Sequence, residues 1–281
     1  MRESAAITRG DAPLVRRALI GVAVGYLSLF VLVPLANVFA QALAGGVTAY
    51  WHVLVRDPDS LHAVILTLTV APAAVAANLT LGVAAAWAIA RFRFPGRAGL
   101  ISLIDLPFSV SPVVAGLVYV LLFGSQGPFG SWLRAHGIAI IFALPGLILV
   151  TVFVTVPFIA RELIPVMEAT GPEEEIAAVT LGAGAWQTFW RVTLPNIKWG
   201  LLYGVILCNA RAMGEFGAAY VVSGHIAGKT ETLPLRAETL FQEYDVRGAF
   251  AVGSMLASMT VLTLVLKALI EWRNRRRRPP A

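Results

Sequence analysis

Long runs of apolar residues, separated by short polar segments, recur along the whole of this sequence. The hydrocarbon core of a bilayer is about 30 Å thick and a helix rises about 1.5 Å per residue, so about 20 apolar residues make one crossing. The pattern therefore predicts an all-α integral membrane protein with six transmembrane helices. The predicted spans are residues 18–41, 62–90, 100–123, 138–160, 199–222 and 248–270.

The polar segments between the spans predict the orientation, because Lys and Arg collect in short loops on the cytoplasmic side. Most of the 22 Lys and Arg residues fall in alternate segments, among them the tail 1–17, the loop 161–198 and the tail 271–281. Both termini are therefore expected to be cytoplasmic, with a core over residues 61–270 that follows the first span. The Arg-rich end is interpreted as a topology signal that also meets anionic membrane lipid, and not as a nucleic-acid patch.

Composition narrows the class further. The chain is 58% hydrophobic and 14% charged, whereas soluble domains carry about 25% charged residues. One Cys208 excludes a disulfide framework and a cysteine-based metal site. The four histidines have no metal-ligand spacing, and no HExxH pattern, serine elbow or catalytic carboxylate pair stands out. We therefore expect a non-catalytic chain without a cofactor or metal of its own.

The segment "EEEIAAVTLGAGAWQTFWRVTLPNI", residues 173–197, is unusual because it opens with three carboxylates in a largely apolar chain. Thr170 and Glu173 have the spacing of a capping box, and acidic residues favour a helix N-terminus. Gly182 allows a sharp turn, and a second helix should stop before Pro195. The sequence thus predicts a helical hairpin on the cytoplasmic side. It serves either as a connection resting at the lipid interface or as a docking site for a partner.

The same segment resembles the EAA loop of ABC-importer membrane subunits, in which two alanines, a glycine and a Leu-Pro pair recur at similar spacing. The family's glutamate belongs at position 176, which is Ile176 here, and the nearest carboxylate is Glu175. The resemblance implies the type I ABC importer (MetI-like) permease fold and a loop that docks on a separate ATPase subunit. The docking residues that it implies are Glu175, Ala177, Ala178, Gly182, Ala183, Leu194 and Pro195.

Other stretches point to a substrate class. "NARAMGEFGAAYVVSGHIAGKTETLPL", "LPFSVSPVVAGLVYVLLFG" and "ETLFQEYDVRGAFAVGS" resemble sulfate/thiosulfate permeases, in particular the W-type subunits (CysW). That resemblance implies a permease subunit that moves sulfate or thiosulfate across the bacterial inner membrane by ATP-driven import. The implied partners are a T-type permease forming a heterodimer, two ATPase subunits that bind ATP and Mg, and a periplasmic binding protein. Molybdate/tungstate permeases share part of these motifs and are the alternative.

Two groups of polar residues inside the spans are candidates for the translocation path. Arg211 and Glu215 are four residues apart, so they face each other on a helix and can form an ion pair. An intramembrane Arg is costly and needs a partner or a wet cavity. The pair either fixes helix packing or gives positive potential to an anion path. Ser109 and Ser111, near two prolines of the third span, either line a polar path or hydrogen-bond within their own helix.

The stretch "SGHIAGKT", Ser223 to Thr230, only superficially resembles a phosphate-binding loop, since its first glycine is one position late. It is expected on the outer side, near a gate or the docking surface for a binding protein. Lys229, Arg236 and His225 could bias that mouth toward anions, but the nearby carboxylates of Glu231, Glu238, Glu243 and Asp245 dilute the effect. A gradient-driven secondary transporter is a rival hypothesis. It would need acidic relay residues or inverted repeats, and Glu215 is the one candidate relay.

Overall fold

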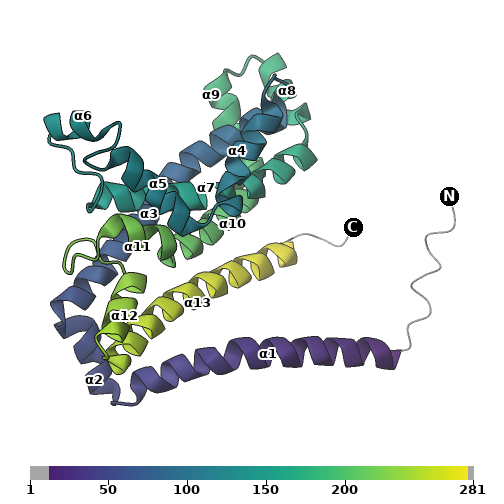
Figure 1. Cartoon of the computed structure of the whole chain (residues 1–281). Coiled ribbons are helices and arrows are strands. Elements are labelled where there is room, and N and C mark those ends of the chain that lie inside the picture. Colours follow the sequence, from purple (N-terminus) through teal and green to yellow (C-terminus); the bar gives the residue numbers. More distant parts are fainter. Residues whose placement is uncertain (1–12, 278–281) are drawn as a thin grey trace.

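The computed structural model describes residues 13–277, which form helices without any strand (Figure 1). The predicted tail positions 1–12 and 278–281 lie outside these described residues. In chain order the elements are α1 (Pro13–Leu43), α2 (Val47–Trp51), η2 (His52–Arg56), α3 (Pro58–Arg91), α4 (Arg97–Ser109), α5 (Pro112–Phe123), α6 (Gly130–Ala135), α7 (Leu144–Thr170), α8 (Glu173–Thr180), α9 (Ala185–Thr188), η3 (Phe189–Thr193), α10 (Leu194–Met213), α11 (Gly217–Ser223), α12 (Leu233–Gln242) and α13 (Val246–Arg277).

Four unbroken helices among the described residues are long and apolar enough to cross a membrane: α1, α3, α7 and α13. Two further crossings require broken pairs, in which α4 and α5 are bent by 108° and α10 and α11 by 52°. Each predicted span overlaps one of these helices or pairs. The all-helical prediction is confirmed, whereas the count of six crossings and the cytoplasmic position of both ends stay predictions.

The predicted span over residues 100–123 is not one helix. α4 ends at Ser109, Ser111 is extended with φ −58° and ψ 133°, and α5 begins at Pro112. The proline ring disfavours a helical conformation at the residue before it, and proline lacks the N–H that would continue the hydrogen-bond ladder. The sequence thus contains the cause of the break, but the size of the bend follows from the packing of α5 against α11.

The predicted span over residues 138–160 is displaced along the chain. α7 starts at Leu144, with Pro145 in its first turn, and runs to Thr170, where Gly171 ends it with a φ of 72°. The predicted loop 161–198 therefore begins inside a helix. Charge is tolerated there because Arg161 and Glu168 each have an ion-pair partner on α4.

The core is built where α3, α7 and α10 pack together. Glycines bring the backbones close: a Cβ added at Gly82 would lie 2.9 Å from Ile159 atoms, and one at Gly204 would lie 3.2 Å from the Ile159 Cα. Ile159 itself is fully buried. Asn78 on α3 donates from Nδ2 to Thr155 Oγ1 on α7 at 2.8 Å. Small residues and interhelical side-chain hydrogen bonds are typical of helix packing in membranes.

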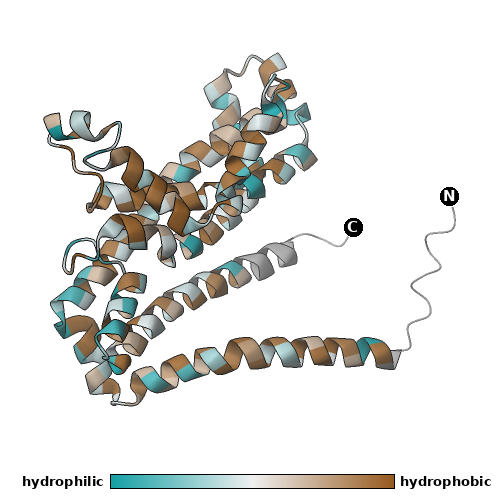
Figure 2. Ribbon diagram, viewed as in Figure 1, coloured by the Kyte–Doolittle hydropathy of each residue, from teal (hydrophilic) through white to brown (hydrophobic). Residues whose placement is uncertain are grey.

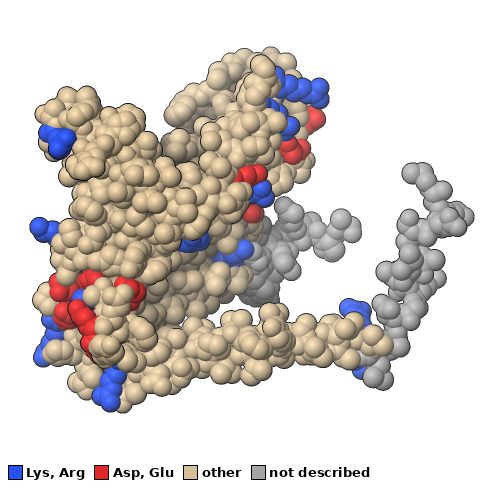
Figure 3. Space-filling view, in the orientation of Figure 1, with Lys and Arg blue, Asp and Glu red and all other residues tan. Residues whose placement is uncertain are grey.

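Apolar side chains also cover the outside of the molecule. Figure 2 shows hydrophobic residues along α1, and none of its most apolar window is buried. α1 packs along α13 and otherwise lies apart from the bundle (Figure 1). In Figure 3 charged residues gather toward the ends of the helices, and α1 is almost free of them between its ends. Such a surface suits lipid or another membrane chain.

Candidate functional site

The predicted hairpin is present at residues 173–188. Three glutamates occupy the first turn of α8, where the helix dipole favours negative charge. The turn comes at Gly182, whose φ is 91° and whose N–H donates to the Val179 carbonyl at 2.9 Å. A residue with a Cβ is strained at this φ, which explains the glycine. α9 then begins at Ala185.

Two local expectations at the hairpin were wrong. Thr170 does not cap α8: it is the last residue of α7, and its Oγ1 donates to the Val166 carbonyl at 2.7 Å. The chain also does not leave the helix before Pro195. The π turn Phe189–Thr193 precedes α10, and Pro195 falls in the first turn of that helix. A π turn is a known place where a helix accommodates an interruption of its regular hydrogen-bond ladder.

Glu175 faces the protein and holds the base of the hairpin. Its carboxylate pairs with Arg91, the last residue of α3, with 3.0 Å between Nε and Oε2 and 3.2 Å between Nη2 and Oε1. The Arg91 side chain is 8% exposed and that of Glu175 is 15% exposed. Thr193 Oγ1 donates to the same carboxylate at 3.0 Å, and Arg91 Nη1 donates to the Met167 carbonyl at 2.7 Å. Two-point pairing of this kind fixes geometry as well as charge.

Arg91 was missed as a site residue, because in the sequence it counts only as one of several basic residues after a span. Its role depends on contact with Glu175, which lies 84 positions away in the sequence. No rule based on local spacing could have revealed this contact. Position 176, where the family glutamate is expected, carries an outward side chain: Ile176 is 58% exposed. The carboxylate lies one position earlier than in the family pattern, at 175 and not at 176. As a result Glu175 fixes the base of the hairpin, and Ile176 is exposed on its outer surface.

The outer surface of the hairpin is apolar. Leu181 is 89% exposed at the tip, and Val179 and Trp186 are also exposed beside Ile176. Of the predicted docking residues, Ala177, Gly182 and Pro195 are exposed, while Ala178, Ala183 and Leu194 are half-buried. Large apolar groups exposed at a turn mark a surface suited to contact another protein.

The predicted ion pair between Arg211 and Glu215 is confirmed. Arg211 Nη1 lies 2.7 Å from Glu215 Oε2, and the Glu215 side chain is 2% exposed against 33% for Arg211. Glu215 does not lie in the same helix, however, because α10 ends at Met213. Its other oxygen, Oε1, accepts a hydrogen bond from the Ala218 N–H at 2.9 Å in the first turn of α11. The carboxylate thus links the end of α10 to the start of α11.

The two helix breaks meet in space. A Cβ added at Gly217, at the start of α11, would lie 3.1 Å from the Pro112 Cβ at the start of α5. Ser109 and Ser111 flank the other break, both are exposed, and neither side chain has a hydrogen bond within the described residues. The structure therefore places the predicted path residues around one junction of interrupted helices. Interrupted backbone at membrane depth occurs where it lines a cavity or is covered by protein.

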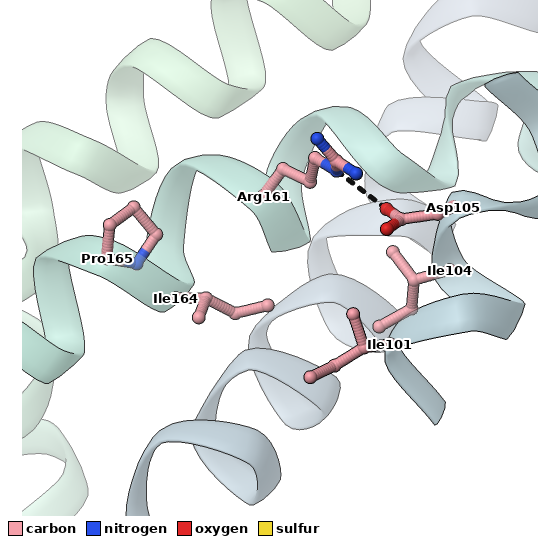
Figure 4. A pocket seen from close by; sticks show the side chains of 6 residues that line it. All are labelled: Ile101, Ile104, Asp105, Arg161, Ile164 and Pro165. Atoms are coloured by element: carbon pink, nitrogen blue, oxygen red, sulfur yellow. Dashed lines mark hydrogen bonds and ion pairs between the residues drawn. The ribbon is translucent and has the colours of Figure 1, made fainter. Parts of the chain in front are cut away.

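A separate hollow lies between α4 and α7, with a cavity volume of about 170 Å³. In Figure 4 Arg161 and Asp105 lie at one side of it and isoleucines form the other walls. Arg161 Nε donates to Asp105 Oδ1 at 2.6 Å, and its guanidinium lies 5.4 Å from the centre of the Phe108 ring. The ion pair between Arg161 and Asp105 explains how α7 can continue through a charged residue after its apolar stretch.

At the opposite end of α3 the expected anion-attracting mouth is only partly present. Arg236 is 7% exposed and lies between two carboxylates, 2.9 Å from Asp57 Oδ2 and 3.6 Å from Glu231 Oε2. Its charge is therefore balanced by Asp57 and Glu231. Glu231 is one of the carboxylates expected to dilute the attraction of anions, whereas the contact with Asp57 was not predicted. Burial opposes ionisation of Asp57, but hydrogen bonds from Ser60 and Arg236 outweigh it and lower the pKa of this carboxyl. Within the described residues no cluster of side chains suits a metal ion.

Comparison with known proteins gives consistent results. Residues 78–279 match the family "binding-protein-dependent transport system inner membrane component". The chain is 52% identical over 255 residues to the sulfate transport system permease protein CysW of Escherichia coli (strain K12), covering 91% of this chain and 87% of that protein. It is 37% identical over 245 residues to CysT of the same organism, covering 87% and 88%.

The fold also matches a solved structure. A chain of a bacterial ABC transporter involved in import of the acidic polysaccharide alginate superposes with a TM-score of 0.74, covering 95% of this chain and 96% of that one. The two are 16% identical, so this match speaks for the fold alone. It agrees with the type I ABC importer (MetI-like) permease fold.

Proposed function

This chain belongs to the binding-protein-dependent transport system inner membrane components and, among them, to the CysW-type sulfate permeases, and from this premise we propose that it imports sulfate or thiosulfate. It is a multi-pass membrane protein and a non-catalytic permease subunit. The evidence for this substrate is the 52% identity with a sulfate permease over 91% of this chain. That similarity also disfavours molybdate or tungstate as the cargo and a gradient-driven mechanism.

In this proposal the energy comes from ATPase subunits on separate chains, two per transporter, that bind ATP and Mg. They contact the hairpin through its exposed tip, around Leu181 and Gly182. The support is a tip that is apolar and exposed while its base is fixed to α3 by the Arg91–Glu175 pair. A rigid base and an available surface are what a mechanical connection requires, because movement at the tip then reaches α3 and α10.

The remaining partners follow from the family. A second permease of the T type, similar to the CysT relative, completes a heterodimer in the bacterial inner membrane, and a periplasmic binding protein delivers the anion. The long exposed face of α1 offers apolar surface for membrane contacts. The segment Ser223 to Thr230 starts at the last residue of α11, at the end of the bundle that we assign to the periplasm.

We assign the anion path to the junction of the two helix breaks. Ser109 and Ser111 present hydroxyl groups without internal partners, and Arg211 is one-third exposed near the same junction. Guanidinium geometry suits an oxyanion. Its pairing with the buried Glu215 keeps the positive potential moderate, so that an anion is attracted and still released.

Reconstitution tests the proposal. The chain, its T-type partner, the ATPase and the binding protein are placed in proteoliposomes, and uptake of labelled sulfate is measured with thiosulfate or molybdate as competitors. We expect uptake that requires ATP and is blocked by thiosulfate but not by molybdate. Competition by molybdate alone would reassign the cargo, and uptake driven by a proton gradient without ATP would contradict the role of the hairpin.

A further inference from the structure

The short segment between α1 and α3 has two faces. α2 and the π turn η2 form one continuous helical stretch over residues 47–56. Its inner face packs on the bundle: Leu54 is buried, Tyr50 and Val53 join the same apolar cluster, and the Tyr50 hydroxyl lies 3.2 Å from Ser254 Oγ on α13. The segment is therefore fixed in orientation and is not a loose connection.

The outer face of this segment is exposed and lines a hollow. A stripe of residues 48, 51, 52, 55 and 56 follows the i, i+3, i+4, i+7 spacing of one helix face. With Ala49 these residues line an open hollow with a volume of about 600 Å³. The members of this stripe, which we call the α2 stripe, are Thr48, Trp51, His52, Val55 and Arg56.

The α2 stripe combines apolar and basic groups. Trp51 and Val55 are 54% and 53% exposed. Neither Arg56 nor His52 has a side-chain hydrogen bond or ion pair within the described part of the chain. The neighbouring carboxylate, Asp57, is already engaged by Arg236 and Ser60. The stripe thus presents a guanidinium and an imidazole that have no hydrogen-bond or ion-pair partner among the described residues, beside an exposed aromatic ring.

More positive charge lies close by. The Arg247 side chain approaches the turn before α2, where a Cβ added at Gly45 would lie 4.0 Å from Arg247 Nη1. Arg247 is exposed and has no hydrogen bond or ion pair among the described residues. Figure 3 shows blue atoms at the end of the molecule where α2 lies in Figure 1. Two arginines from separate parts of the chain, Arg56 and Arg247, therefore lie at the two ends of this short segment.

The depth of the segment suits lipid headgroups. From Ser60 to Ala90 the chain has no Asp, Glu, Lys or Arg, so the apolar crossing of α3 begins within four residues of Arg56. The adjoining α1 is an apolar helix whose surface is exposed. Trp is enriched at this level of a membrane, and helices with Arg on one side and Trp beside it bind in the interface plane.

We propose that the α2 stripe binds the headgroup of an anionic phospholipid in the leaflet at this end of the spans. Arg56 and His52 contact the phosphate, and Arg247 adds long-range attraction. The Thr48 hydroxyl donates a hydrogen bond to the headgroup. Trp51 and Val55 contact the glycerol and the upper acyl chain. Guanidinium groups pair well with phosphate, and basic pockets beside membrane helices are suited to anionic headgroups. A protein partner that binds through carboxylates would be expected to contact a wholly polar patch. The α2 stripe instead combines a basic side chain with apolar ones, which matches the charged headgroup and the apolar chains of a phospholipid.

The test measures lipid binding by the purified transporter complex in detergent. Fluorescent phosphatidylglycerol is titrated, with phosphatidylcholine and inorganic phosphate as competitors, for the wild type and for Arg56→Gln, His52→Gln and the double variant. Arg134→Gln on α6, an exposed arginine outside the stripe, is the matched control. Removal of the Arg56 charge should weaken binding roughly fivefold, loss of the His52 ring should weaken it less, and the control should stay within about twofold. Both variants replace exposed side chains, so folding should be retained.

Three results would overturn the proposal. Arg56→Gln could bind phosphatidylglycerol as tightly as Arg134→Gln does. Inorganic phosphate could compete as well as the phospholipid, which would make the stripe a site for free anions. A photo-crosslinker at position 55 could label the second permease and no lipid, which would mean that a protein covers the stripe. Sulfate uptake is not the readout, so failure here would leave the transport proposal intact.

Discussion

Both ends of α3 carry an arginine–carboxylate pair, but the two pairs hold very different structures. Arg91, the last residue of α3, holds the hairpin through Glu175, and the hairpin beyond it is exposed and apolar. At the other end, Asp57 precedes α3 and binds Arg236 of α12, whose Leu233 is fully buried. The first pair fixes only the base of an element that has free surface. The second fixes an element that is already packed against the core.

This difference separates function from stability. A change at the hairpin removes little packing inside this chain, so its main effect should fall on contact with a partner. A change at the α12 end acts within the folded chain, so its effect should be seen in unfolding. The effect on uptake should therefore be largest for changes at the tip of the hairpin, smaller for changes at its base and smallest for changes at Asp57.

Gly182→Arg should reduce ATP-dependent uptake by at least about tenfold while the chain still reaches the membrane. The φ of 91° is unfavourable for any residue with a Cβ, by about 1–2 kcal/mol, and the new side chain enlarges the exposed tip. Uptake and the amount of membrane-inserted chain are measured together.

Two alanine variants separate strain from bulk. Gly184 has a φ of −72° and open space around it, so Gly184→Ala should transport normally. Gly182→Ala keeps the strain without the bulk and should lie between Gly182→Arg and the wild type. Equal uptake by Gly182→Arg and the wild type would falsify the docking role of the tip.

Glu175→Gln should loosen the base of the hairpin without unfolding the chain. Replacing a buried charged acceptor costs about 2 kcal/mol. If this cost falls on local opening, amide hydrogen exchange at residues 176–183 should accelerate about 30-fold, because 1.4 kcal/mol corresponds to a factor of ten. Uptake should fall several-fold.

The control for this change is Glu174→Gln, since Glu174 is exposed and bonds Asn196 at the surface. Arg91→Gln combined with Glu175→Gln should be less harmful than the sum of the single changes, because neither charge is then left alone. Strictly additive effects would show that the pair does not act as a unit.

Much of this fold could be predicted from the sequence, because long apolar stretches and local turn residues act over short distances. The spans of α1, α3 and α13 and the glycine turn at Gly182 follow from such signals. The break at Ser111 could be predicted from Pro112. The angle of the bend could not, because it depends on which helix packs against α5. The boundaries of α7 were missed because Arg161 is polar in the sequence and paired in the structure.

The candidate site was less predictable, for a physical reason. Arg211 and Glu215 are four residues apart, so their closeness in the sequence was enough to predict the pair, although Glu215 lies just past the end of α10 and not on it. Arg91 and Glu175 come from segments 84 positions apart, and only the packing of α7 beside α3 brings them together. The same holds for the contact between Arg236 and Asp57, which lie 179 positions apart in the sequence.

Asp57→Asn should give the smallest effect and a distinctive dependence on pH. The pKa of Asp57 is lowered in the folded protein, so the charged form contributes stability that is present above the ordinary aspartate pKa of about 3.9. That contribution, about 1 kcal/mol, is lost as the pH falls through the lowered pKa. The difference in unfolding free energy between wild type and Asp57→Asn should therefore be constant from pH 7 to pH 5 and shrink below about pH 3.9. Uptake at neutral pH should change less than in the hairpin variants. A difference that grows on acidification, or an uptake defect as large as that of Gly182→Arg, would show that the two ends of α3 do not divide stability from function in this way.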